Sequence, residues 1–187
     1  MPNMGSRHTS QKLLPAVLLV ISLTALPAVM AASAKPRAST VQFYMHDRPG
    51  DTAVRVAPAA PLNFSGGPGD FVGAMFGSLY VMDNPLTAGP EANSTVVGRA
   101  QGVYAMASRS DEFSLFMALT YAFVAGPFNG SSFSVVGLNA VARDVRELPI
   151  VGGTGAFRLA RGYCLARTHA SQGMDAIVRY NATILHY

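Results

Sequence analysis

The chain has 187 residues, of which 50% are hydrophobic and 13% are charged, and its formal net charge is +4. It has one cysteine, Cys164, so no disulfide can form within the chain, and its basic residues form no run with interleaved aromatic residues of the kind that binds nucleic acid. The histidines show no H-x-x-x-H spacing and no G-x-S-x-G string occurs, so we predict neither a metal site nor a covalent hydrolase.

The N-terminus has the three parts of a secretory signal peptide. A polar start with two basic residues is followed by the apolar run Leu13–Met30 and then by the small residues Ala32-Ser33-Ala34. We predict a signal peptide over 1–34, cleaved before Lys35, and a mature, secreted domain over 35–187 with no membrane attachment. A single membrane anchor is the alternative, but two prolines interrupt the run. Without the signal peptide the net charge falls to +2, which weakens the case for nucleic acid further.

Most of the mature sequence alternates between apolar and polar residues, which is the period of β-strands. Clusters of glycine, proline and asparagine separate these segments, as at 65–69 and 129–130. Eight segments at hairpin spacing predict an all-β fold, either an antiparallel sandwich or a closed eight-stranded antiparallel β-barrel. The predicted strands are Thr40–His46, Ala53–Ala57, Phe71–Met82, Thr95–Ala107, Phe113–Val124, Ser131–Val141, Phe157–His169 and Asp175–His186.

Three of these strands each have one face of unusually small side chains. Gly98, Ala100 and Gly102 share such a face with Tyr104, and Phe113–Val124 has large side chains on one face and mostly small ones on the other. In Phe157–His169 the small face is formed by Ala160, Gly162, Cys164 and Ala166. If the small faces point inward, a barrel of this size keeps a cavity for a small ligand. If they point outward, another subunit can pack closely on them, and the pattern alone does not choose between the two.

Several isolated features have a plain structural interpretation. Gly152-Gly153-Thr154-Gly155 resembles a phosphate-binding loop, but a strand-like segment follows it where a helix is needed, so we interpret it as a tight turn. Cys164 lies among alternating strand residues and is expected in the core. The signal peptide makes four N-x-S/T triplets candidate glycosylation sites, which are Asn63, Asn93, Asn129 and Asn181.

A few polar residues stand in otherwise apolar strands. Carboxylates and an arginine beside an apolar cavity can have shifted pKa values and serve as an acid or as an anion holder. The alternative is structural, because aspartates that follow strands commonly cap turns. The polar residues concerned are Asp47, Asp83, Tyr104, Asn139 and Arg146.

Longer strings of the mature chain carry a family resemblance. In order, they resemble the successive signatures of the dirigent proteins of plants and span almost the whole mature sequence. The strings are FYMHD (43–47), DNPLTAGP (83–90), VVGRAQGVY (96–104), GPFNGSS (126–132), VRELPIVGGTGAFRLARGY (145–163) and the closing RYNATILHY.

This resemblance implies a secreted, N-glycosylated eight-stranded antiparallel barrel of the apoplast and cell wall, usually a homotrimer. We expect a trimer also because the apolar face of Phe113–Phe123 would cover a neighbour if it pointed outward. Dirigent proteins act on phenoxy radicals made by a separate oxidase, a laccase or peroxidase, or on quinone methides. We therefore expect a phenolic substrate, stereoselective coupling and no cofactor; a quinone-methide cyclase or a non-catalytic organiser of lignin deposition are the alternatives.

The resemblance also implies a site. Asp47 matches the aspartate of the family's HD string, Asp83 the first aspartate of its DDxLT-like string, Tyr104 the tyrosine after GRAQG, and Arg146 the arginine before the glycine-rich turn. We expect these four residues to meet at one cavity as catalytic groups. The residues expected to contact the ligand beside them are Gly98, Ala100, Gly102 and Asn139.

The chain departs from the family pattern at two of these strings. The DDxLT-like string has an asparagine, Asn84, in second place. Lignan-coupling members have an aspartate seven residues before the arginine, where this chain has Asn139. An amide can donate a hydrogen bond but cannot supply a proton as an acid, so we do not assign the chain to the lignan-coupling subgroup.

Overall fold

The computed structural model describes residues 35–59, 71–109 and 112–187. The predicted signal peptide and the triplet at Asn63 lie outside these ranges. The described chain is almost entirely β-structure. Its strands are β1 (Arg37–Asp47), β2 (Ala53–Ala57), β3 (Leu79–Thr87), β4 (Val96–Met106), β5 (Ser114–Phe123), β6 (Ser132–Ala140), β7 (Arg146–Thr154), β8 (Arg161–Gln172) and β9 (Asp175–His186), with short helices α1 (Phe71–Met75), η1 (Gly126–Phe128) and η2 (Gly155–Phe157).

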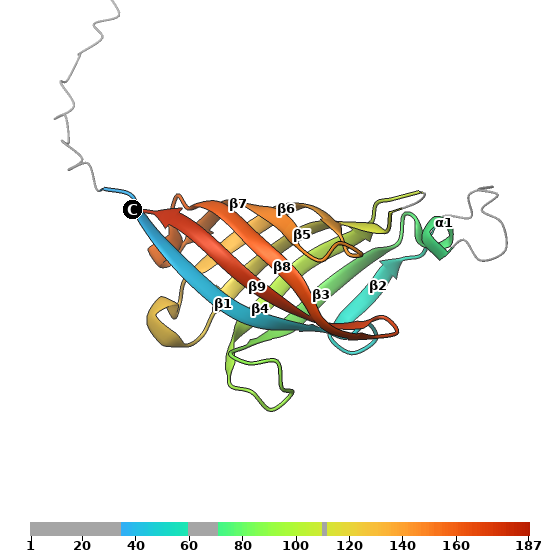
Figure 1. Cartoon of the computed structure of the whole chain (residues 1–187), viewed down its shortest axis with the longest axis horizontal. Helices are drawn as coiled ribbons and strands as arrows, with labels where there is room; N and C mark the ends of the chain where they lie inside the picture. Colours follow the sequence, from blue (N-terminus) through green and yellow to red (C-terminus); the bar gives the residue numbers. More distant parts are fainter. Residues whose placement is uncertain (1–34, 60–70, 110–111) are drawn as a thin grey trace, which may run out of the picture. The chain divides into compact units, whose positions relative to one another are not determined.

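The strands form one antiparallel sheet that closes on itself (Figure 1). Its order is β1-β9-β8-β7-β6-β5-β4-β3-β2, and the additional pairing of β1 with β3 closes the ring. Tyr44 and Met45 of β1 pair with Thr87 and Leu86 of β3, while β2 pairs with the other half of β3. Eight strands therefore make the barrel, and the predicted eight-stranded antiparallel β-barrel is confirmed.

The predicted strands differ from the observed ones at several places, including the predicted start at Phe157, since β8 begins at Arg161. The segment 71–82 was expected to be one strand, but it begins with the helical turn α1, and the strand starts at Leu79. The prediction also missed β7, because Pro149 and the glycines at 152 and 153 interrupt its alternating pattern. The turn predicted at 152–155 is also shorter than expected, because residues 152–154 still belong to β7. Gly155, with φ of +60°, is the first residue after the strand and begins η2.

One half of the barrel interior is filled by aromatic rings. Phe43 of β1 stacks on Tyr180 of β9, with ring centroids 5.4 Å apart, and it also contacts Tyr121 at 5.1 Å. Phe133 and Phe157 extend this cluster, and all five residues are fully buried. The cluster closes this part of the interior, so any ligand space must lie in the other half.

The small faces of β4 and β8 point inward, whereas that of β5 points outward. A Cβ atom added to Gly98 or to Gly102 would lie 2.2 Å from a carbonyl oxygen of β5, so these glycines allow the two strands to approach closely. Opposite them stand Phe123 and Leu119 of β5, whose large side chains point inward. The interior space beside these small residues is therefore occupied by β5 side chains rather than left open.

Cys164 on β8 also faces inward and is fully buried. Burial raises the pKa of its thiol to about 12, so the thiolate is scarce at neutral pH. The expectation of a core cysteine is met. In the part of the chain that the structure describes, no helix is long and apolar enough to span a membrane.

The outer surface of β2 to β6 carries a row of apolar side chains, here called the outer ladder. Val54, Val81, Val103, Ala118 and Val136 pair in register across the five strands. Next to this row Phe116 pairs with Leu138, and these side chains are 41% and 62% exposed. The apolar face that sequence analysis expected to meet a neighbour, Phe113–Phe123, points inward instead, because its large rings fill the barrel.

Candidate functional site

A cavity of about 410 Å³ occupies the half of the barrel that the aromatic cluster leaves open. It is lined by residues at the end of β1, β4 and β6, at the beginning of β5, β7 and β9, and by the β8–β9 hairpin. A volume of this size is typical of a small-molecule site. Most of its wall is apolar, formed by Met45, Met106, Phe113, Leu115, Met117 and Val178.

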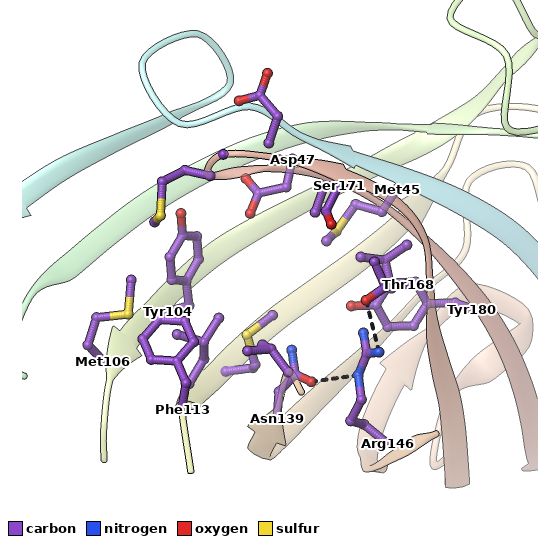
Figure 2. A pocket seen from close by; sticks show the side chains of 18 residues that line it. Met45, Asp47, Tyr104, Met106, Phe113, Asn139, Arg146, Thr168, Ser171 and Tyr180 are labelled. Carbon is purple, nitrogen blue, oxygen red and sulfur yellow. Dashed lines mark hydrogen bonds between the residues drawn. The ribbon is translucent and has the colours of Figure 1, made fainter. Parts of the chain in front are cut away.

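Arg146 forms a positively charged wall of this cavity although it is only 4% exposed. Its Nε donates a hydrogen bond to Asn139 Oδ1 at 3.1 Å, and its Nη1 donates one to Thr168 Oγ1 at 3.0 Å (Figure 2). The same Nη1 also donates to the carbonyl oxygen of Arg143 at 3.2 Å. All three acceptors are neutral, and no ion pair between Arg146 and a carboxylate is formed within the described ranges. Burial lowers the pKa of the guanidinium, while the nearby Tyr180 and Asp144 oppose this shift.

Asp47 and Tyr104 stand on another side of the same cavity (Figure 2). Burial raises the pKa of the Asp47 carboxyl, and the nearby charge of Asp175 raises it further, while a hydrogen bond from Asn84 opposes the shift. The Tyr104 ring is held by a parallel stack on Tyr80, with centroids 4.8 Å apart. Burial and the charge of Asp47 raise the pKa of Tyr104 well above its usual value, so its phenol stays protonated and can donate a hydrogen bond.

The structure does not bring Asp83 to the cavity. Successive residues of a strand point to opposite faces, and Asp83 lies on the outer face of β3 between the inward-facing Met82 and Asn84. Its carboxylate pairs with Arg99 at 2.5 Å, and both side chains are about half exposed. Three of the four expected catalytic residues therefore share the cavity, and the fourth belongs to a surface ion pair.

The residues expected to contact the ligand are also divided. Asn139 lines the cavity, where its Oδ1 is used by Arg146 and its amide nitrogen remains for a ligand. Gly98, Ala100 and Gly102 face inward, but they stand opposite large β5 side chains and do not line the cavity. Their small size serves the close approach of β4 and β5, and the structure does not place them at this cavity.

Sequence analysis missed several residues that shape the site. Thr168 and Tyr180 lie beside Arg146, and burial raises the pKa of Tyr180 to about 12. Asn84 is fully buried behind Asp47 and donates a hydrogen bond to its Oδ1 at 3.0 Å. The departure of the DDxLT-like string at Asn84 was visible in the sequence, but only strand pairing shows that this position, and not Asp83, faces inward.

The site thus combines two chemical capacities around an apolar space. A buried guanidinium with neutral partners can stabilise negative charge that develops on a bound oxygen. A carboxyl with a raised pKa holds its proton to higher pH than an exposed aspartate does and can release it to a ligand. Neither capacity requires a metal or an organic cofactor.

Comparison with known proteins identifies the family. The family model described as dirigent-like protein matches residues 38–185. Dirigent protein 1 of Arabidopsis thaliana is 45% identical over 175 residues, covering 91% of this chain and 92% of that protein, and pterocarpan synthase 1 of Glycine max is 51% identical over 116 residues, covering 60% and 61%. The solved pterocarpan synthase dirigent protein GePTS1 matches with a TM-score of 0.72 and 39% identity, covering 83% of this chain and 88% of that one. The chain therefore belongs to the dirigent family.

Proposed function

We propose that this dirigent protein binds a phenylpropanoid-derived quinone methide or phenoxy radical in its cavity and directs the stereochemistry of the bond that forms. The observation that carries the proposal is the buried guanidinium of Arg146, which has only neutral hydrogen-bond partners and faces a cavity that also contains Asp47. A phenolic oxygen that gains negative charge would supply the anionic partner that Arg146 lacks.

The chemistry of a quinone methide fits these groups. When a hydroxyl group adds to the exocyclic carbon, the electron pair moves to the carbonyl oxygen, which becomes a phenolate. Arg146 and the amide nitrogen of Asn139 would stabilise this oxygen. Starting from the phenolate of the precursor, Asp47 in its acid form would protonate the leaving hydroxyl, which departs as water as the phenolate becomes the carbonyl of the quinone methide. The Asp47 carboxylate would then take the proton of the attacking hydroxyl, and the addition restores the phenolate. The proton count closes without an oxidant.

The apolar lining would decide which face reacts. Met45, Met106 and Met117 contribute flexible side chains that can fit an aromatic ligand closely, while Tyr104 offers a fixed hydrogen-bond donor. A ligand held at its oxygen by Arg146 and along its ring by these side chains exposes one face to the incoming group. This would give a chiral product from an intermediate that is itself achiral.

The similarity to pterocarpan synthases favours the quinone-methide form of the proposal, in which the protein turns over as an enzyme. Asn139 also favours the quinone-methide form, because lignan-coupling members of the family carry an aspartate at this position. In the second form, a separate laccase or peroxidase makes phenoxy radicals, and the barrel only steers their coupling. The Arg146 site would serve either form, since a phenoxy radical presents the same oxygen.

The deciding experiment offers phenols and benzylic-alcohol precursors of quinone methides to the purified protein, with and without a one-electron oxidase. Chiral chromatography then measures the enantiomeric excess of each product. We expect the quinone-methide precursors to give a product with enantiomeric excess when no oxidase is present. An enantiomeric excess that appears only when an oxidase is added would establish the second form, in which the barrel steers radical coupling. Racemic products throughout, with cavity variants no different from the native protein, would contradict the proposal and favour a wall-organising role.

We also propose that the protein is secreted to the apoplast and glycosylated. Asn93, Asn129 and Asn181 are all exposed, and Asn181 lies on the outer face of β9, where a glycan has room. Treating plant-expressed protein with a glycosidase should increase its gel mobility, and N-terminal sequencing should begin at or near Lys35. An unchanged mobility, or a sequence that begins at Met1, would contradict this prediction.

We further propose that the protein is a homotrimer whose subunits meet through the outer ladder. Its apolar row is flanked by Phe116 and Leu138, whereas the middle of the outer face of β1 and β9 is polar, with Thr40, Gln42, Arg179 and Asn181. A glycan on β9 would not obstruct a contact made by β3 to β6.

The trimer proposal predicts that Leu138→Glu converts the protein to monomers, because a carboxylate buried at the interface without a partner costs several kcal/mol. Light scattering measures the mass of the native and variant proteins. Thr40→Glu, which adds the same charge to the polar face of β1, is the matched control and should leave the trimer intact. A native protein that scatters as a monomer would refute the proposal.

A further inference from the structure

Asn84 lies directly behind Asp47 at the place where the barrel closes. The pairing of Met45 with Leu86, continued for two residues, brings Asp47 opposite Asn84 across the β1–β3 seam. The Asn84 side chain is fully buried, and its Nδ2 donates a hydrogen bond to Asp47 Oδ1 at 3.0 Å. The two side chains therefore form one unit, with Asn84 on the packed side and Asp47 on the cavity side.

The other end of the Asn84 amide is unsatisfied. Its Oδ1 is buried and has no hydrogen-bond partner in the described part of the chain. A buried carbonyl oxygen without a donor costs free energy, and a leucine of similar size would avoid that cost. The donation to Asp47, with a long second contact to the sulfur of Met82 at 4.0 Å, is the polar interaction that the amide makes in return.

We propose that Asn84 is a positioning residue for Asp47: its amide holds one carboxylate oxygen and leaves the other to exchange a proton with the bound intermediate. This inference rests on the proposed function for the identity of the intermediate. An amide has no proton to lose, so Asp47 titrates against a neutral neighbour on this side. A carboxyl group at position 84 would instead compete with Asp47 for a single proton.

Among the described residues, Asn84 provides the side-chain hydrogen bond that positions the Asp47 carboxylate. Asp47 takes part in no ion pair among the described residues, and no other side-chain hydrogen bond to its carboxyl is formed there. The strand opposite, β3, contributes Asn84, and the Tyr80 ring of the same strand stacks on Tyr104. The titratable or charged groups that face Asp47 or flank it are Asp175 and Tyr180 of β9, Tyr104 of β4, Arg146 of β7, and His46 and Arg48 next to it in the chain.

The test replaces Asn84 in two ways and measures the Asp47 carboxyl directly by carbon NMR across a pH titration. Asn84→Leu removes the N–H that favours the carboxylate, so we expect the pKa of Asp47 to rise by about one unit. Asn84→Asp adds a carboxyl at the same place, so we expect two coupled titration steps, the upper one higher than in the native protein. The pH at which turnover falls to half should move upward by the same amounts.

Gln42→Glu is the matched control, since it adds a carboxylate to the exposed outer face of the same strand, β1, and should leave both curves unchanged. Asn84→Leu should also melt no lower than the native protein, because it removes an unsatisfied oxygen. An unaltered Asp47 titration in Asn84→Leu would overturn the inference; if that variant does not fold, a single unshifted step in Asn84→Asp would do so. A shifted titration without turnover of any precursor would leave the positioning role in place and count against the proposed function.

Discussion

Arg146→Leu is expected to lower the rate of stereoselective product formation by about 10²–10³-fold, the loss seen when a preorganised oxyanion donor is removed. The guanidinium is the positively charged group of the cavity wall whose hydrogen-bond partners are all neutral. Without it, a phenolate that forms in the apolar cavity has no charge to balance it. The remaining product should be close to racemic, because the ligand oxygen is no longer held at one place.

The barrel should survive this substitution. Arg146 donates to Asn139, Thr168 and a carbonyl oxygen, and these acceptors lose a partner, but the cost of burying an uncompensated charge disappears as well. We expect a change in unfolding free energy of about 1–2 kcal/mol, or a few degrees in melting temperature.

Two further variants make the Arg146 result specific. Arg146→Lys keeps the charge but not the planar donor geometry, and should recover part of the rate. Arg179→Leu removes an exposed arginine from the outer face of β9 and should change neither rate nor enantiomeric excess. Native stereocontrol in Arg146→Leu, measured by chiral chromatography on folded protein, would exclude the guanidinium from the mechanism.

Asp47→Asn is expected to reduce oxidase-independent turnover by about 10²–10⁴-fold, which is the usual contribution of a general acid or base. The amide is nearly isosteric with the carboxyl and can still lie beside Asn84, so the shape of the cavity should be preserved. Coupling of radicals supplied by a separate oxidase needs no proton from Asp47 and should be much less affected. The contrast between the two assays on one variant therefore separates the two forms of the proposed function.

The pH dependence follows from the direction of the Asp47 pKa shift. Burial raises the pKa above its ordinary value, so the acid form persists to higher pH than for an exposed aspartate. Turnover that needs this acid should fall as pH rises through the raised pKa, whereas the residual rate of Asp47→Asn should not change over that range. A native profile that shows no fall there would contradict a role for Asp47 as the acid.

The raised pKa of Asp47 also predicts how the stability of Asp47→Asn differs from that of the native protein as pH changes. A raised pKa means that the folded state favours the protonated carboxyl, so the native protein keeps this contribution below the unfolded pKa and loses it as pH rises through the folded pKa. Asp47→Asn should therefore be more stable than the native protein near neutral pH, and the difference should shrink as the solution is acidified. Thermal melts across this pH range measure it.

Local sequence signals were sufficient for the class of fold. Alternating residues and turn clusters predicted an all-β chain of short antiparallel strands, since period and turn chemistry depend only on neighbouring residues. β7 escaped prediction because Pro149 and the glycines at 152 and 153 weaken its local signal. Its pairing comes from β6 and β8, which supply hydrogen bonds that no local pattern records.

The candidate site, like the fold, could be predicted from the sequence only in part. Asp47, Tyr104 and Arg146 could be singled out in the sequence because polar residues are unusual in apolar strands, and the dirigent resemblance gave each a motif. The pattern could not separate Asp83 from Asn84, which are neighbours on one strand and point to opposite faces. That choice depends on the register between β1 and β3, which is set where the barrel closes.

The sequence by itself determined the alternation of each strand, the exclusion of an internal disulfide and the presence of acid, phenol and guanidinium groups in apolar surroundings. Only the tertiary structure decided which face of each strand turns inward. In β5 the large rings turn inward, while in β4 the glycines do, because the backbones of these paired strands approach closely only where a Cβ is absent. Packing the rings into one half of the barrel leaves the other half open, and this places the cavity beside Arg146 and Asp47.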